Sequence, residues 1–336
     1  MRAALASALV LVGCAGPLAD TDARSCGSCH VEQLANWEGS AHARSTSSPV
    51  FQALLPRVEA AWGATARAQC VACHQPGHGG DATIGCASCH LAIGNRGEAN
   101  GALVVKTTVP VAGPRGDASR APHEVTRRGF FESASLCGTC HEVQTPHLVE
   151  ETLTEYRASS RASEDECASC HFDDHRFPGL EPKWGQSPEA RRAGQEAAVA
   201  LVARALKLEV TSSGEVRLTN HGAAHGVPTG QLSLRDLWVD VTVTSADGAR
   251  TEFPRVIELG ARLERDGKEV SLLTDATKVV SRSLHDGESR AWSAPPGRLE
   301  ARLMLRAIRE DTLMALGLAE LRDEVPGQLV ATATRE

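Results

Sequence analysis

The pattern of apolar and polar positions divides this 336-residue chain into two parts. From about residue 207 onward the two kinds of residue alternate, most clearly along 239–243 and 299–305. A period of two is typical of strands with one buried face. Asp-Gly pairs at 247–248 and 266–267 supply turns between such runs. The pattern predicts a β-sandwich domain of immunoglobulin-like type over 207–336.

A helix is predicted immediately before the alternating region, over 186–206. Ser187 is a good N-cap, Pro188 suits the first helical position, and Glu189 adds negative charge to the first turn. Apolar residues then recur at helical spacing as far as Leu206. We expect this helix to connect the two parts of the chain.

The region 26–185 has no such regular pattern. Glycine and proline gather in it, for example at 76–77 and 113–114, and this predicts short helices joined by irregular loops. The fold class expected is therefore α+β with two domains: a mainly helical or irregular domain followed by the sandwich. Aromatic residues make up 4% of the chain, too few to fill two ordinary cores.

The irregular region contains Cys-x-x-Cys-His five times. In this motif two thiols add to the vinyl groups of a porphyrin, and the adjacent imidazole ligates its iron. A zinc site would not require a histidine directly after every second cysteine. The motifs therefore predict five covalently bound haem c groups, which would supply the missing apolar surface. The attachment cysteines are Cys26, Cys29, Cys70, Cys73, Cys86, Cys89, Cys137, Cys140, Cys167 and Cys170, and the motif histidines are His30, His74, His90, His141 and His171.

The cysteine count and the net charge limit the possible disulfides and partners. Ten of the 11 cysteines lie in the motifs and the other is Cys14, so none is left for disulfides. The net charge is −7 and the pI is near 6.0, which gives a nucleic-acid partner no electrostatic support. The same acidity suits a basic redox protein as electron donor or acceptor.

The first 14 residues have the pattern of a secretory signal: Arg2, then an apolar run too short to span a membrane. The sequence Leu-Val-Gly-Cys at 11–14 resembles a bacterial lipobox, which implies cleavage before Cys14 and acylation of its thiol. An ordinary signal peptide is the alternative. We expect an exported protein, anchored by lipid in a bacterial envelope with the outer membrane favoured, and a tether over 15–25.

The chain resembles the multihaem cytochrome c superfamily, specifically its cytochrome c554-like group. The resemblance rests on CGSCHVEQLANWEGSAHA (26–43), IGCASCH (84–90), GPRGDASRAPH (113–123), SLCGTCHEV (135–143), ETLTEYRAS (151–159) and DECASCHFDDHRFPG (165–179). In addition, LTNHGAAHGVPTG (218–230) resembles the HxxPTG element that opens the β-domain attached to many of these cytochromes.

The second axial ligands are expected to be histidines, because methionine occurs only at 1, 304 and 314. The resemblance implies distal ligands to haems elsewhere in the array at His42, His123, His175 and His225, and His78 and His147 are further candidates. The pairing of these histidines with the motifs stays open. The short interval between the second and third motifs indicates that their haems are neighbours.

These features favour an electron carrier with mainly bis-histidine haems, and no catalytic residue is assigned. One alternative is an oxidoreductase with one five-coordinate haem acting on a small nitrogen or sulfur oxyanion. Another is a subunit of a surface cytochrome complex or filament, assembled with other cytochromes through its β-domain. All five motifs end in histidine, which argues against the nitrite reductases that carry Cys-x-x-Cys-Lys at the catalytic haem.

Overall fold

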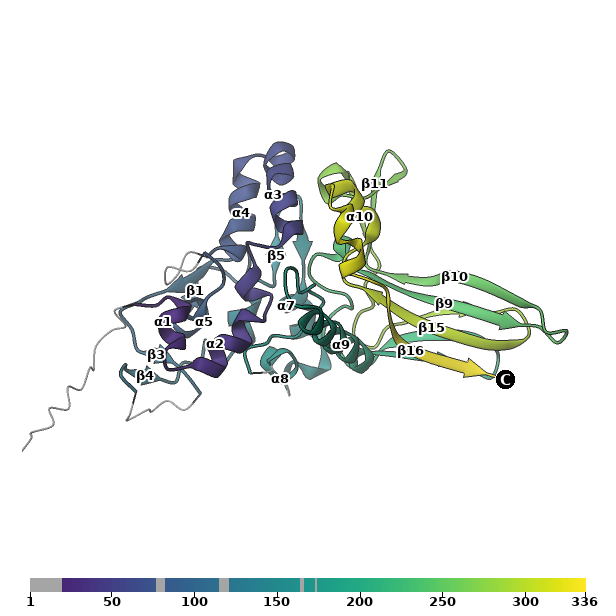
Figure 1. Cartoon of the computed structure of the whole chain (residues 1–336), viewed down its shortest axis with the longest axis horizontal. Helices are drawn as coiled ribbons and strands as arrows, with labels where there is room; N and C mark the ends of the chain where they lie inside the picture. Colours follow the sequence, from purple (N-terminus) through teal and green to yellow (C-terminus); the bar gives the residue numbers. More distant parts are fainter. Residues whose placement is uncertain (1–19, 77–81, 115–120, 164–165, 173) are drawn as a thin grey trace, which may run out of the picture.

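The computed structural model describes residues 20–76, 82–114, 121–163, 166–172 and 174–336. Cys14 and His78 lie outside the described residues. The first part of the chain is mainly helical and the second is rich in sheet, and the two lie side by side along the long axis of the molecule (Figure 1). A mixed helix and sheet class is thereby confirmed. Within the described ranges, no helix is both long and apolar enough to cross a membrane.

Short elements build the first part, as the glycine and proline pattern predicts. The helices are α1 (Ala23–Gly27), α2 (Val31–Glu38), α3 (Pro49–Trp62), α4 (Ala64–His74), α5 (Cys86–His90), α6 (Ala134–Gly138), α7 (Thr152–Ala158) and α8 (Cys167–His171). Three small sheets join them: β1 (Ala92–Asn95) with β2 (Leu103–Val105), β3 (Val111–Ala112) with β4 (Val125–Thr126), and β5 (Val143–Gln144) with β6 (Val149–Glu150). Every motif lies on one of these helices or runs past its end.

The helical part has little hydrophobic core of its own. One cluster in it consists of Ala134, Leu153 and Tyr156, and the Tyr156 hydroxyl donates to the carbonyl of Ala162 at 3.4 Å. This agrees with the small number of aromatic residues in the sequence, and Tyr156 has a packing role. The side chains of the motifs are left to be covered by something other than protein.

Helix α9 (Pro188–Ala205) begins where the N-cap pattern predicts. The Ser187 hydroxyl accepts a hydrogen bond from the amide of Ala190 at 3.3 Å. The helix lies between the two parts of the chain in Figure 1, and it buries Ala198 and Val202 in the core of the sheets. It therefore fixes the sheets beside the helical part.

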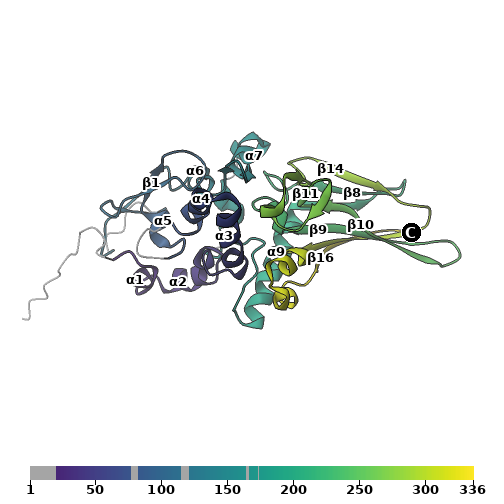
Figure 2. The same cartoon turned by 90° about the horizontal axis from the view of Figure 1, so that it is seen from above.

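Two antiparallel sheets share that core. Their strand orders are β10 (Arg250–Leu259), β9 (Asp236–Thr244), β15 (Arg298–Arg306), β16 (Gln328–Arg335), and β14 (Ser289–Ser293), β8 (Glu215–Asn220), β7 (Leu206–Val210). Leu218 of one sheet and Leu303 of the other are fully buried in it. Figure 2 shows the sheets as separate layers. The predicted layering is present, and the immunoglobulin-like type stays a prediction.

A third sheet and a last helix lie where the sheets meet the helical part. The sheet has the order β12 (Lys268–Val270), β11 (Ala261–Arg265), β13 (Lys278–Ser281), and the helix is α10 (Glu310–Leu316). Val50 of α3 packs with Leu313 and Leu316 of α10 in one buried cluster, which holds the two parts together. Short 3₁₀ helices complete the described structure: η1 (His42–Arg44), η2 (Ser160–Ser163), η3 (Leu232–Leu234), η4 (Leu273–Asp275) and η5 (Ala319–Glu324).

Candidate haem sites

Three motif histidines each face a histidine from a distant part of the chain. Two imidazoles on opposite faces of one iron, each bonded at about 2 Å, have ring centres about 6 Å apart. The separations of the ring centres in the structure are 6.4 Å for His30 and His123, 6.1 Å for His90 and His175, and 5.9 Å for His171 and His225. These pairs fit a haem iron held between them.

The contact made by Nδ1 of a motif histidine determines whether Nε2 is free to ligate a metal. In three motifs Nδ1 lies against a backbone carbonyl: His74 to Ser45 at 2.9 Å, His90 to Ala112 at 2.7 Å, and His171 to Pro178 at 3.2 Å. A carbonyl oxygen accepts and never donates, so Nδ1 carries the proton and Nε2 keeps its lone pair for a metal. The protein therefore holds these rings in the tautomer that ligates iron.

The fourth motif differs, because its histidine faces a carboxylate. Nδ1 of His141 lies 3.7 Å from Oε1 of Glu150, whose side chain is 10% exposed. This carboxylate raises the pKa of His141, whereas burial lowers the pKa values of His74, His90 and His171. The environments of the motif histidines are thus not equivalent.

His42 lies on the 3₁₀ helix η1, near two motif histidines. Burial, together with the neighbouring His141 and His74, lowers its pKa to about 4. Its ring centre is 4.6 Å from that of Phe177. His42 is therefore a neutral imidazole, the form that can ligate a metal.

The structure gives less evidence on the other two candidate ligands, His147 and His78. The ring of His147 stacks on Trp62 with centres 4.5 Å apart and planes 3° apart, and that of His74 stacks on Phe51 at 4.2 Å. In the part of the chain that the structure describes, neither His74 nor His141 forms a histidine pair like the three above. His78 is outside that part.

Attachment cysteines from different motifs meet in the middle of the helical part. A hydrogen bond from Cys73 to Cys140 raises the pKa of the Cys73 thiol, and Cys137 is bonded in the same way to Cys167, whose pKa falls to about 7. The fourth motif therefore touches the second and the fifth, and α1 of the first motif packs on α5 of the third.

Helix α7 positions the loop that carries His225. The carboxylate of Glu155 accepts the amide of Gly226 at 2.8 Å and lies 3.0 Å from Nδ1 of His285. The hydroxyls of Thr152 and Thr229 are hydrogen-bonded at 2.5 Å. The sheet-rich part thus brings His225 to His171 across the boundary between the two parts.

Sequence reasoning missed both carboxylates, Glu150 and Glu155. A signal for Glu150 exists, since Thr145-Pro146 predicts a turn between Val143 and Val149 and a hairpin there returns residue 150 to the motif at 141. No local pattern marks Glu155, because its partners belong to the other part of the chain.

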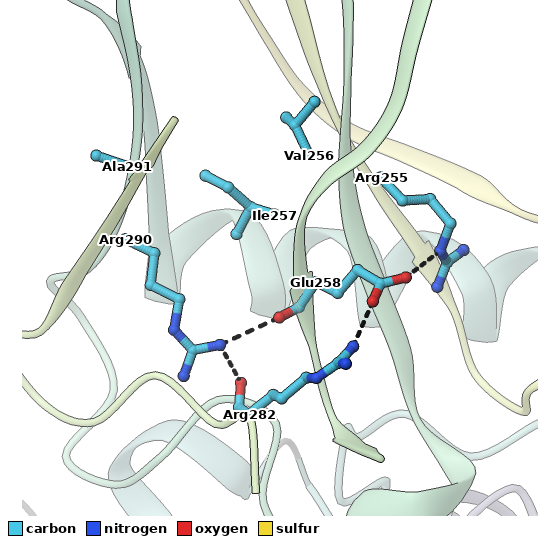
Figure 3. Close-up of a pocket in the computed structure, with 7 residues that line it drawn as sticks. All are labelled: Arg255, Val256, Ile257, Glu258, Arg282, Arg290 and Ala291. Atoms are coloured by element: carbon cyan, nitrogen blue, oxygen red, sulfur yellow. Dashed lines mark hydrogen bonds and ion pairs between the residues drawn. The ribbon is translucent and has the colours of Figure 1, made fainter. Parts of the chain in front are cut away.

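A groove of about 390 Å³ lies on the sheet-rich part (Figure 3). Three arginines line it, and their donors are already engaged. Arg255 and Arg282 are paired with the carboxylate of Glu258, and Arg290 donates to the carbonyls of Glu258 and Arg282 at 3.1 Å and 2.9 Å. These arginines hold strands together, and the groove is not a candidate site.

Comparisons with known proteins found one family model and one similar solved structure. The family model described as cytochrome c554 and c-prime matches residues 25–91, a span that holds the first three motifs. The solved structure of a penta-heme cytochrome c552 from Thermochromatium tepidum has a similar fold, with a TM-score of 0.71 and 17% sequence identity over 95% of this chain and 99% of that one. No curated protein matches. The family match and the shared fold together support a multihaem cytochrome c.

Proposed function

We propose that this protein is an exported electron carrier with five haem c groups, one on each Cys-x-x-Cys-His motif. The proposal rests on three histidine pairs whose ring centres are separated by similar distances, between 5.9 Å and 6.4 Å. The similar structure from Thermochromatium tepidum is described as penta-heme, which supports the count. Bis-histidine ligation favours low potentials and leaves no open position for a substrate.

The proposed axial ligands follow from these contacts. The pairs are His30 with His123, His90 with His175, and His171 with His225. For His74 and His141 the candidates are His42, which lies near both of them, His147 and His78. The HxxPTG element at 225–230 would then supply a ligand from the second domain.

The meeting of the attachment thiols supports electron transfer between haems. Cys73 contacts Cys140, and Cys137 contacts Cys167, so the groups attached through them would have adjoining edges. The fourth motif would lie between the second and the fifth in the array. Donors and acceptors would be redox proteins that dock where the outer motifs reach the surface, and a net charge of −7 favours basic ones.

One observation favours an enzyme as the second candidate. Among the described residues, His74 and His141 have no histidine opposite them at the spacing of the three pairs, so one of their haems is where an open position would lie. Such a haem binds and reduces or oxidises a small molecule, here a nitrogen or sulfur oxyanion.

Addition of cyanide or nitrite to the ferric and ferrous protein separates the two candidates. The carrier gives a low-spin electron paramagnetic resonance spectrum that neither ligand changes, and its haems are reduced and reoxidised reversibly. A high-spin ferric signal that disappears on ligand binding would instead establish the enzyme.

The proposal includes a lipid anchor at Cys14, supported by the Leu-Val-Gly-Cys sequence. Replacing Cys14 with serine removes the thiol that would be acylated, so the haem protein should move from the membrane fraction to the soluble fraction. Fractionation of cells that make the wild-type protein or the Cys14→Ser variant checks this. Equal membrane retention of both would remove the anchor from the account.

A further inference from the structure

The histidine of the fourth motif has a carboxylate beside its Nδ1 atom. The Nδ1 atoms of His74, His90 and His171 lie against neutral backbone carbonyls, whereas Nδ1 of His141 lies 3.7 Å from the carboxylate of Glu150. The distance is within ion-pair range. When the haems are chemically identical, a different neighbour at Nδ1 of the ligating histidine changes the properties of the iron.

The fold holds Glu150 in this place. It is the last residue of β6, which the β5–β6 hairpin returns beside the fourth motif, and its side chain is 10% exposed. The Thr152 hydroxyl donates to Glu150 Oε1 at 3.2 Å, and Gly230 of the second domain lies close to the same carboxylate. The buried guanidinium of Arg235 donates to the carbonyls of Leu180 and Ala307, so its hydrogen bonds go elsewhere.

Two effects of this carboxylate on a haem iron have the same sign. Negative charge in a poorly hydrated place stabilises iron(III) over iron(II). A carboxylate also attracts the Nδ1 proton more strongly than a carbonyl does, which makes the imidazole a stronger donor to iron(III). Both effects lower the reduction potential.

We propose that Glu150 gives the haem of the fourth motif a lower reduction potential than the haems whose motif histidines face carbonyls. This inference rests on the proposed function, because it needs a haem at that motif. His141 would hold the iron through Nε2 and keep its Nδ1 proton toward Glu150, while the haem would accept and release one electron with redox partners. The fourth motif touches the second and the fifth through its thiols. Its haem would therefore pass electrons between the other two but would itself be mostly oxidised, because its potential is lower.

The test is a spectroelectrochemical titration of the full haem-loaded protein with glutamine at position 150. Glu150→Gln keeps the shape and a hydrogen-bond acceptor but removes the charge. The potential of the second motif's haem, whose His74 and Cys73 the same carboxylate also affects, should shift slightly, and three potentials should stay in place. The potential of the fourth motif's haem should shift furthest, to a more positive value. The same haem should show changed g-values in the electron paramagnetic resonance spectrum. Glu151→Gln, which removes an exposed charge from the next residue, should change neither.

Glu150→Asp separates charge from packing. It keeps the carboxylate, so its lowest potential should stay closer to wild type than that of Glu150→Gln. Equal shifts in the two variants, or no shift in Glu150→Gln, would overturn the inference. If Glu150→Gln does not fold, the aspartate variant alone decides. A potential of the fourth haem that rises to the range of the other haems would count against a role of the carboxylate charge. A retained low potential would support that role. A wild-type protein without haem at the fourth motif would instead refute the proposed function.

Discussion

Replacing His175 with alanine should convert one haem, the one ligated by His90, from six-coordinate low spin to five-coordinate high spin. The ring centres of these two residues lie 6.1 Å apart, and alanine has no group that reaches the iron. About one fifth of the iron should then give a high-spin ferric signal in electron paramagnetic resonance, since there are five motifs. Cyanide should bind to that haem alone.

The same result is expected for His123→Ala and His225→Ala, each at a different haem. His225→Ala is the most informative, because its histidine comes from the sheet-rich part. His221→Ala is the matched control: it lies in the same loop, and its backbone amide donates to the carbonyl of Ala205 at 3.0 Å while its carbonyl accepts from Arg161. Low-spin spectra in all three distal variants would remove these residues from the ligand list.

Removal of the attachment thiols of the fourth motif should divide the array. Cys137→Ser with Cys140→Ser prevents covalent attachment at the motif whose thiols contact Cys73 and Cys167, so the haem count should fall from five to four. An electron injected by a laser flash should then fail to spread rapidly from the second motif to the fifth. Transient absorption of the haem bands measures this redistribution.

A control with the same haem count removes an outer motif instead. Cys26→Ser with Cys29→Ser also leaves four haems, but it keeps the contacts between the second, fourth and fifth motifs. Rapid redistribution should survive among those three. If the two double variants equilibrate at the same rate, the fourth motif does not lie between the second and the fifth in the array.

Local chemistry in the sequence predicts much of the fold. Ser187 and Pro188 locate the start of α9, and the Asp266-Gly267 turn locates β11, because a cap or a turn depends on residues a few positions apart. The same holds for the motifs, whose two cysteines and histidine bind one group. The α3–α4 hairpin was not foreseen, although Ser48 and Pro49 form a helix start.

The arrangement of the motifs could not be predicted in this way. The short interval between the second and third motifs predicts that their haems are neighbours, and this stays a prediction, whereas no sequence interval indicates the contact of Cys73 with Cys140 of the fourth motif. Pairs such as His30 with His123 depend on the whole fold, and so does the approach of Glu150 to His141. Resemblance to known cytochromes pointed to the distal histidines without giving their partners.

The central claim is that each of the five motifs binds a haem covalently through its two thiols. A pyridine haemochrome assay on the purified protein, referred to polypeptide concentration, tests this most directly. The account predicts five haem equivalents per chain, retained after denaturation because the bonds are covalent. A colourless protein, or clearly fewer than five equivalents, would contradict it.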